Sequence, residues 1–328
     1  MSIQIAIIGA GISGLTCARK LSAVGRRAVV FEKSRGVGGR MATRRTPEGY
    51  RFDHGAQYFT VRDDKFAQEV AVWEQLKHVA LWNGVIGSLD SGSFSPKENP
   101  KPRYVGVPAM NSACKHLAEG IDIRLNTRIQ PPNFSEGAWH LRDDEGNDLG
   151  NFEALIVSAP AAQTAELAAE ATEIRAAAER VKIDGCWAVM LAFDKPLPLE
   201  FDGAFVENSP LSWICRNSSK PGRETTDCWV VHASPGWSQD QIDRSPELVL
   251  TPLLEAFWQA TGVSKVAPLF CAAHRWRYSI PVEPLESHCV EDPAKKAIAC
   301  GDWCGGPRVE GAYLSGLAAA ERLLGWYA

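Results

Sequence analysis

The sequence has no long hydrophobic run, no strong excess of charge of one sign and no CxxC pair of cysteines. No apolar stretch in the 328 residues approaches the roughly 18 to 20 residues that a membrane span requires. A net charge of −4 excludes a generally basic nucleic-acid binder. The HExxH, P-loop and GxSxG motifs are also missing. We therefore expect no nucleic-acid or membrane partner and predict no metal site.

The nine cysteines are odd in number and scattered along the chain, which is not the pattern of a disulfide framework. They are typical of reduced, mostly buried thiols in a reducing cytosol, so we predict a cytoplasmic protein. The apolar residues 3–8 run directly into glycines and follow no basic segment, which favours a strand over a signal peptide. The length favours two interleaved domains.

The hydrophobic pattern changes along the chain from that of an α/β unit to that of a mixed sheet. Residues 3–8, 15–24 and 28–31 predict a strand, a helix and a strand. Short strands over 186–193, 204–206, 211–215 and 228–233 predict a mixed or antiparallel sheet, and 88–108 is expected to be a long surface connection. Further helices are expected over 63–77, 108–120, 161–180, 246–261 and 311–324, further strands over 121–125, 154–158, 272–280 and 297–300, and a hairpin over 139–149.

The sequence GAGISG lies between the first expected strand and helix. Its glycines allow a tight turn and a close approach of the backbone to a pyrophosphate at the helix N-terminus. An acid ends the next strand, 18 residues after Gly14, where it can accept hydrogen bonds from an adenosine ribose. The pattern predicts dinucleotide binding, with a merely tight turn as the alternative. The predicted cofactor contacts here are Gly9, Gly11, Ile12, Gly14, Glu32 and Lys33.

Two further segments indicate which dinucleotide is bound. The stretch KSRGVGGRMATRR resembles the extended FAD signature of amine-oxidase-like flavoproteins, in which an arginine meets the pyrophosphate; Gly39 and Arg40 match it. The segment RFDHGAQYFT resembles a turn beside the flavin ring in the same proteins, where Gly55 and Ala56 would let the backbone approach the cofactor. Gln57 and Tyr58 would then face the substrate. An ordinary strand with a buried tyrosine is the alternative for this segment.

The C-terminal segment CGDWCGGPRVEGAYLSG predicts another contact with the cofactor. A strand ends at Asp302, which can bind ribityl or phosphate-linked hydroxyls, and a helix starts near Gly311, between Glu310 and Ala312. The free N–H groups at that helix start would face the flavin edge that becomes anionic on reduction. Ile129 matches the residue whose backbone meets the adenine in such flavoproteins. A helix that only packs and a plain core isoleucine are the alternatives.

The order of these motifs resembles the amine-oxidase superfamily, and four segments resemble its renalase family, particularly the bacterial members: DHGAQYFTVR, WVVHASPGWS, HRWRYSIP and GDWCGGPRVEGAYLSG. The resemblance covers nearly the whole chain. It implies an α/β fold of the para-hydroxybenzoate-hydroxylase type. A Rossmann-type FAD-binding domain (1–60, 109–165 and 297–328) would be interleaved with a mixed α+β substrate domain (61–108 and 166–296).

The same resemblance implies an activity. It implies non-covalent FAD and oxidation of the 1,2-dihydro and, in some members, 1,6-dihydro isomers of β-NAD(P)H to NAD(P)+, with O2 reduced to hydrogen peroxide. An amine oxidase or a desaturase of the same superfamily is an alternative. A flavin-bound interaction protein without turnover is another.

A dihydropyridine needs orientation more than a strong base, because aromatisation favours loss of its hydride. The side chains that could form a stacking slot are Tyr58, Trp187, Trp213 and Trp276. His232 is expected to point at the ligand from a strand, and Arg277 to reach a carboxamide or phosphate. A core histidine and a surface salt bridge are the alternatives for these two residues.

Overall fold

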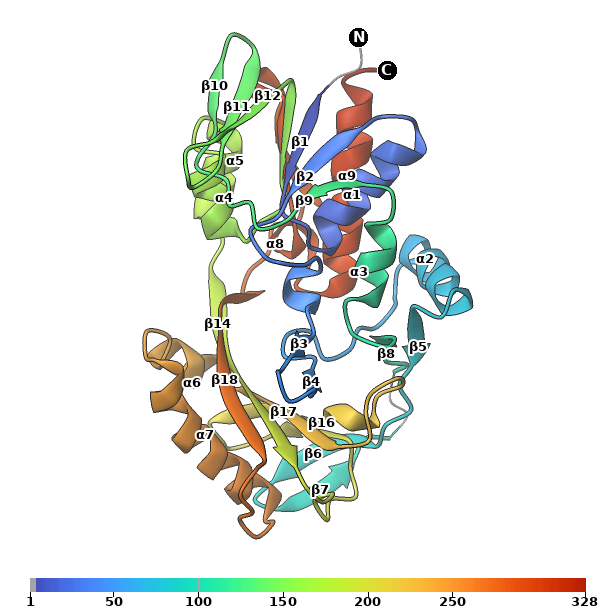
Figure 1. Ribbon diagram of the computed structural model, residues 1–328, viewed down its shortest axis with the longest axis vertical. Helices are drawn as coiled ribbons and strands as arrows, with labels where there is room; N and C mark the ends of the chain where they lie inside the picture. Colours follow the sequence, from blue (N-terminus) through green and yellow to red (C-terminus); the bar gives the residue numbers. More distant parts are fainter. Residues whose placement is uncertain (1–3, 99–100) are drawn as a thin grey trace.

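The computed structural model describes residues 4–98 and 101–328 and contains two large sheets, one above the other in Figure 1. The upper sheet has six strands in the order β19-β20-β13-β1-β2-β9, all parallel except the edge strand β19. Every residue of β1, β13 and β20 is buried, as expected for a parallel sheet covered on both faces. The strands are β1 Ile5–Ile8, β2 Ala28–Phe31, β9 Asp122–Arg124, β13 Ala154–Val157, β19 Cys289–Asp292 and β20 Ala297–Cys300.

Helices cover one face of the upper sheet, and a small antiparallel sheet with two short helices covers the other (Figure 1). The α1–α9 contact is very close: a Cβ added at Gly316 would lie 2.1 Å from the carbonyl oxygen of Ser13. The first face holds α1 Ile12–Ala23, α3 Ser112–Leu117 and α9 Val309–Gly325. The second holds β10 Asn133–Ser135, β11 Ala138–Arg142, β12 Asp148–Phe152, α4 Ala161–Leu167 and α5 Thr172–Glu179.

The lower sheet has seven strands in the order β18-β14-β17-β16-β15-β6-β7. Its longest strands, β14 and β18, extend upward toward the first sheet (Figure 1). The strands are β6 Ile86–Asp90, β7 Ser93–Pro96, β14 Ile183–Phe193, β15 Gly203–Val206, β16 Leu211–Arg216, β17 Asp227–Ala233 and β18 Phe270–Pro281. Helices α6 Pro235–Asp240 and α7 Pro246–Thr261 pack against β14 and β18.

Short elements fill the space beside and between the two sheets. Helix α2 begins as predicted, with the Asp63 carboxylate accepting hydrogen bonds from the N–H groups of Lys65 and Phe66. The remaining elements are α2 Asp64–Gln75, α8 Asp302–Gly305, the paired strands β3 Arg44–Arg45 and β4 Arg51–Phe52, the paired strands β5 Val79–Leu81 and β8 Tyr104–Gly106, and the 3-10 turns Gly39–Met41, Asn217–Ser219 and Pro293–Lys295.

Two predicted segments differ in the structure. The stretch 88–108 is not a plain connection, because it contains the end of β6 together with β7 and β8; Pro96 is tolerated at the end of an edge strand. Pro100 lies outside the described residues. The expected helix 161–180 breaks into α4 and α5, since Ala168 and Ala171 at the break are fully buried and core packing overrides helix propensity. The short elements α6 and β19 were not predicted.

Both segments expected for the substrate domain, 61–108 and 166–296, supply strands to the lower sheet. Strand β19 lies within the second of these segments but pairs with β20 of the upper sheet. Helix α5, which lies in the same segment, also packs on the upper sheet. We therefore propose the two-domain division with boundaries after α5 and before β19. No helix among the described residues is long and apolar enough to cross a membrane.

The α1–α9 contact generates a prediction. Gly316→Ala should lower the free energy of unfolding by about 1 to 3 kcal/mol, because the new Cβ would force the helices apart. That loss should exceed the gain of up to about 1 kcal/mol in helix propensity. Gly325→Ala in the same helix is the control, because a Cβ there meets nothing within 4 Å. Urea unfolding measures both variants; equal behaviour would contradict the prediction.

Candidate cofactor and substrate site

The glycine-rich turn between β1 and α1 has the geometry of an anion-binding site. A Cβ at Gly9, whose φ is +107°, would lie 2.3 Å from the carbonyl oxygen of Ser158, and one at Gly14 would lie 2.1 Å from that of Gly9. A Cβ added at Gly11, by contrast, would meet no atom of the protein within 4 Å, so there is open space beside this residue. No side chain caps α1 and its first turn has no acidic residue, so the N–H groups that precede Leu15 in the helix are available to a phosphate, whereas that of Leu15 donates to the Gly11 carbonyl.

Glu32 fixes this turn. Its buried carboxylate accepts hydrogen bonds from the N–H groups of Ala10 and Ser34, both at 2.8 Å. Each oxygen keeps a further lone pair that a ribose hydroxyl could use. Ile129 is buried in the adjoining core, whereas Lys33 is exposed and contacts Gln163 on α4 at 3.4 Å. The structure thus places Glu32 and Ile129 near the ends of β1 and β2 but directs the Lys33 ammonium toward α4.

Arg40 and Asp302, both predicted cofactor residues, form a bidentate ion pair with two N–O distances of 2.7 Å. Arg40 also donates to the carbonyl oxygen of Ser279 at 2.8 Å. Gly39 precedes it with a φ of +51°. The Arg40 side chain keeps 29% of its surface exposed, so part of the guanidinium remains accessible. Arg40, in the loop that follows β2, therefore meets Asp302, which follows β20 and is 262 positions away in the sequence.

The segment at Gly55 and Ala56 packs directly against the backbone of Arg40. The N–H of Ala56 donates to the carbonyl oxygen of Arg40 at 2.9 Å, and a Cβ at Gly55 would lie 2.0 Å from that same oxygen. It would also lie 3.2 Å from the Trp276 indole. The glycine is required because Arg40 and Trp276 leave no room for a side chain.

The start of α9 is uncapped by any side chain, which leaves its first N–H groups free. Gly311 is required here, since a Cβ would lie 2.3 Å from the carbonyl oxygen of Gly306; Ala312 is nearly buried beside it. The Glu310 carboxylate does not point at this site. It accepts hydrogen bonds from the N–H groups of Arg62 and Asp63 at 2.6 and 2.9 Å, so its side chain orders the start of α2 instead.

Three histidines and a tryptophan form what we call the imidazole–indole cluster: His54, His232, His274 and Trp276. The rings of His54, His274 and Trp276 lie with centroids 4.6 to 4.9 Å apart. The carbonyl oxygen of His54 accepts hydrogen bonds from the Trp276 indole at 3.0 Å and from His232 Nε2 at 3.1 Å. His54 Nδ1 is buried and has no partner among the described residues.

All three imidazoles are neutral at physiological pH. Burial lowers the pKa of His54 to about 3, helped by His274, Arg44 and His232. Burial likewise lowers the pKa of His232 to about 4, with a further contribution from Lys220. The pKa of His274 is lowered to about 4 by burial and by Arg44. The cluster therefore presents an uncharged, flat surface near Arg44 and near Lys220, which is itself paired with Asp53.

Asp53, which sequence reasoning missed, is fully buried between two cations. Its carboxylate contacts the Lys220 ammonium at 3.3 Å and the Arg223 guanidinium at 2.7 Å. The side chains of all three residues are at most 1% exposed. Thr43 and the N–H of Met110 also donate to it. Despite burial, which acts the other way, Lys220 and Arg223 lower the pKa of Asp53 to about 2.

Gln57 belongs to this buried network. Its Oε1 accepts a hydrogen bond from Lys220 at 3.2 Å, and its Nε2 donates to the carbonyl oxygens of Asp53 and Gly55. The Gln57 amide also lies 3.4 Å from His232 Nε2. Because the His54 carbonyl can only accept, His232 carries its proton on Nε2. Gln57 thus orients the site from within, rather than facing open space.

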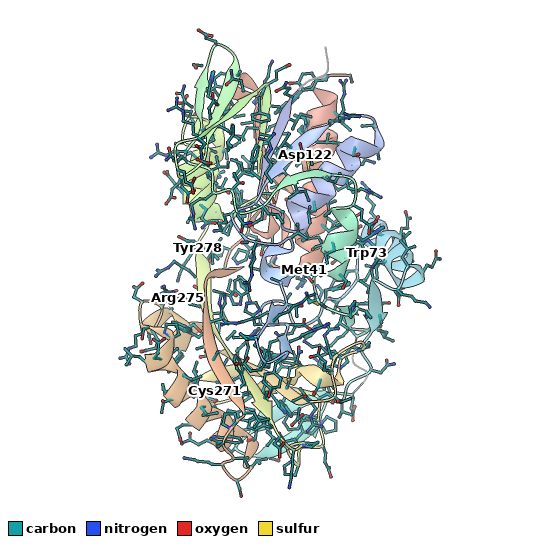
Figure 2. The ribbon with its side chains drawn as sticks, viewed as in Figure 1. Met41, Trp73, Asp122, Cys271, Arg275 and Tyr278 are labelled. Carbon is teal, nitrogen blue, oxygen red and sulfur yellow. The ribbon has the colours of Figure 1, made fainter. Side chains whose placement is uncertain are left out.

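The other residues predicted to contact the substrate do not all lie at the imidazole–indole cluster. Tyr58 packs against Trp82 and Trp213 under the Arg103 guanidinium, whereas Trp187 is fully buried in the core of the lower sheet. The other substrate candidates lie on β18, along which Figure 2 labels Cys271, Arg275 and Tyr278.

Arg277 does not join the cluster. It is adjacent to Trp276 on β18 and therefore points to the opposite face of the strand. There it pairs with the exposed Asp243 at 2.7 Å. This is the surface salt bridge that the sequence left as the alternative.

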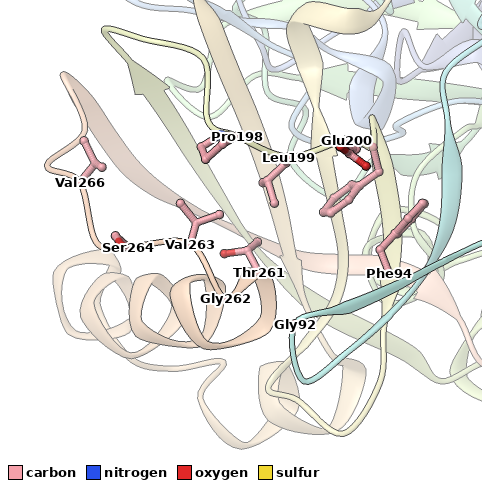
Figure 3. A pocket seen from close by; sticks show the side chains of 11 residues that line it. Gly92, Phe94, Pro198, Leu199, Glu200, Thr261, Gly262, Val263, Ser264 and Val266 are labelled. Atoms are coloured by element: carbon pink, nitrogen blue, oxygen red, sulfur yellow. The ribbon is translucent and has the colours of Figure 1, made fainter.

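Two hollows on the surface lie elsewhere. One, of about 600 Å³, opens between the β6–β7 hairpin, the end of α7 and residues 198–201; Figure 3 shows its lining, in which Leu199 and Val263 lie beside polar residues such as Glu200. The other, of about 680 Å³, lies between α5, α9 and residues 285–291. None of the predicted cofactor or substrate residues lines either hollow.

A tight glycine turn, two uncapped helix starts and an acid at the end of β2 fit a dinucleotide with a pyrophosphate and a flavin. The fold and this site define a flavoprotein oxidoreductase with FAD as its cofactor. The pattern of an NAD(P)-binding Rossmann-like domain matches residues 7–80, and that of a flavin containing amine oxidoreductase matches residues 101–324. The chain belongs to the flavin containing amine oxidoreductase family.

Known proteins share the whole fold but little sequence. A proposed protoporphyrinogen oxidase from Exiguobacterium sp. superposes with a TM-score of 0.79 at 13% identity, covering 98% of this chain and 99% of that one. Putrescine oxidase bound to putrescine gives 0.72 at 12% identity, covering 99% of both chains. A 4,4′-diapophytoene desaturase from Staphylococcus haemolyticus is 42% identical over 61 residues, which are 19% of this chain and only 12% of the desaturase.

The buried Asp53 generates a prediction. Asp53→Asn should lower the free energy of unfolding by about 3 to 5 kcal/mol, because Lys220 and Arg223 would lose their counter-charge. Since the pKa of Asp53 is lowered to about 2, its contribution is complete above about pH 4 and is lost as the pH falls toward 2. The variant should therefore lose less stability than wild type over that interval.

Asp243→Asn is the matched control, because Asp243 also pairs with an arginine but is 81% exposed. It should cost less than about 1 kcal/mol. Urea unfolding at pH 7, 4 and 3 measures all three proteins. Equal losses for the two variants would refute the assignment of Asp53 as a buried charge that holds the site.

Proposed function

We propose that this protein is an FAD-dependent oxidase that converts 1,2-dihydro isomers of β-NAD(P)H, with the 1,6-dihydro isomers as further substrates, to NAD(P)+. Bound FAD would accept the hydride and pass its electrons to O2, which yields hydrogen peroxide. We propose a stacking and orienting role for the imidazole–indole cluster and a pyrophosphate and ribose role for Arg40, Asp302, Glu32 and the glycine turn.

The charge around the cluster supports this proposal more than any other observation. The charged side chains that shift the pKa values of His54, His232 and His274 are Arg44 and Lys220, both cations. Asp53, the carboxylate nearest to Gln57, already contacts two cations. Such surroundings favour a substrate with phosphate groups and disfavour an ammonium group.

The neutrality of the cluster fits a reaction that needs no general base. Oxidation of a dihydronicotinamide gives an aromatic ring directly, so no proton has to leave the reacting carbon. The stacking slot then only has to hold the dihydronicotinamide ring parallel to the flavin and at the correct distance from it. Trp276, fixed by its hydrogen bond to the His54 carbonyl, and the two adjacent imidazoles offer flat surfaces for that purpose.

The second candidate is an amine oxidase or a desaturase of the same family. The family's own description and the likeness in fold to putrescine oxidase favour an amine. The short match to a 4,4′-diapophytoene desaturase favours a desaturase, but it covers only 19% of this chain and 12% of that protein. Flat aromatic rings such as that of Trp276 can hold an ammonium group by cation–π contact, but the positive charge of Arg44 near the cluster opposes one.

Anaerobic mixing of the FAD-loaded protein with each substrate class tests the proposal. The 1,2-dihydro isomers should bleach the flavin absorbance within seconds, whereas putrescine and an isoprenoid should leave it unchanged. Bleaching by an amine or an isoprenoid alone would overturn the proposal in favour of the second candidate. If none of these substrates bleaches the flavin, the result would favour neither enzyme and would indicate a flavin-bound protein without turnover.

Trp276→Ala should slow flavin reduction by roughly tenfold to a hundredfold through misorientation, without abolishing it. Arg277→Ala is the control on the opposite face of β18 and should leave the rate unchanged. Because the pKa values of His54, His232 and His274 lie at about 3 to 4, the wild-type rate should be flat from about pH 6 to 9. Anaerobic stopped flow measures this; a steep pH dependence that disappears in His232→Ala would show that His232 is a base.

A further inference from the structure

A group of three metal-ligating side chains lies outside the flavin site, where the segment between α2 and β5 meets α3 (Figure 1). His78 directly precedes β5, His116 lies in α3, and Glu119 follows the end of that helix. The ligand atoms of the three side chains lie within 4.8 Å of one another. Among residues 4–98 and 101–328, this is the one group of three or more His, Cys, Asp or Glu side chains with that spacing.

The distances within the group are close to those of a metal centre. His116 Nδ1 lies 3.2 Å from Glu119 Oε2. A tetrahedron with metal–ligand bonds of about 2.0 to 2.1 Å has edges of about 3.3 Å, so these two atoms already span one edge. The His78 ring lies alongside that of His116, with centroids 4.7 Å apart and planes inclined by 23°. Rotation of the half-buried His78 side chain could therefore bring a third ligand atom to the same centre.

The backbone fixes the three residues while their side chains stay accessible. The N–H of His78 donates to the Trp73 carbonyl, and the His78 carbonyl accepts from the N–H of Val107, both at 2.8 Å. The N–H of Glu119 donates to the His116 carbonyl at 3.1 Å, and the Glu119 carbonyl accepts from the Arg19 guanidinium at 2.9 Å. The Glu119 side chain is 62% exposed, and within the described residues no lysine or arginine pairs with its carboxylate.

We propose that His78, His116 and Glu119 bind a divalent transition-metal ion, with Zn²⁺ as the best match. Two imidazoles, one carboxylate and a water molecule complete a tetrahedral set for Zn²⁺. Mg²⁺ requires an octahedral set of oxygen ligands, which this group does not offer. The ion would fasten the start of β5 to α3. At the other end of α3, Asn111 donates to the Val37 carbonyl at 3.3 Å, in the loop that leads to Arg40.

Zinc binding to the FAD-loaded protein tests this site directly. Isothermal titration with Zn²⁺ should give one site per chain, and excess Mg²⁺ should not compete. His78→Ala and His116→Ala should each weaken binding at least tenfold. Glu119→Gln changes an exposed side chain without changing its size, so it should fold normally and still bind Zn²⁺ more weakly. Zn²⁺ should also raise the melting temperature of wild type and not that of His78→Ala.

His140→Ala is the matched control, because it removes a half-buried histidine from β11, outside the group. It should bind Zn²⁺ like wild type. Unchanged FAD content in every variant would show that the flavin site is intact, so a loss of binding would belong to the proposed ligands. The proposal is overturned if wild type binds no Zn²⁺ at 0.1 mM, a concentration of about the upper limit for a specific site, or if all three ligand variants bind it as wild type does.

Discussion

A buried carboxylate surrounded by more positive charge than it can neutralise holds the centre of this protein together. Asp53 has no exposed surface, and its one negative charge faces both Lys220 and Arg223. Burial of such groups is costly unless every partner is in place. The three residues come from the segments after β4 and β16, so the network ties the segment that carries Gly55, which packs against the backbone of Arg40, to the lower sheet. The position of the backbone that we propose to face the flavin depends on this contact.

The same network determines the polarity of the site. Lys220 donates to Gln57 Oε1, which forces the amide N–H groups of Gln57 toward the carbonyls of Asp53 and Gly55. His232 then donates through Nε2 to the carbonyl of His54, and its other nitrogen is left as an acceptor. The buried charge of Lys220 thus sets the direction of the hydrogen bonds that Gln57 makes.

Local patterns were sufficient to predict most of the longer strands and helices, but not the short elements such as β7, β8, α6 and β19 or the contacts between elements. The turn at Gly9 and helix α7 followed from periodicity and helix-stop signals, and α7 has the predicted bounds. Lys220 lies in a polar loop, 167 residues from Asp53, and no local pattern could pair them. Arg277 is different: Trp276 and Arg277 are neighbours on a predicted strand, so alternation already excluded that both face one ligand.

The distribution of charge also explains how one fold can serve unlike substrates. The proposed pyrophosphate and ribose contacts would rest on backbone geometry and on Glu32, Arg40 and Asp302, which any FAD-binding chain of this fold could use. The chemistry of the slot, in contrast, depends on His54, His274 and Trp276, which project from the lower sheet and the segment before it. If the proposed function holds, the charge of the substrate would decide which molecules enter: the positive charge of Arg44 would repel an ammonium group, whereas a phosphate-bearing ring would not meet that repulsion.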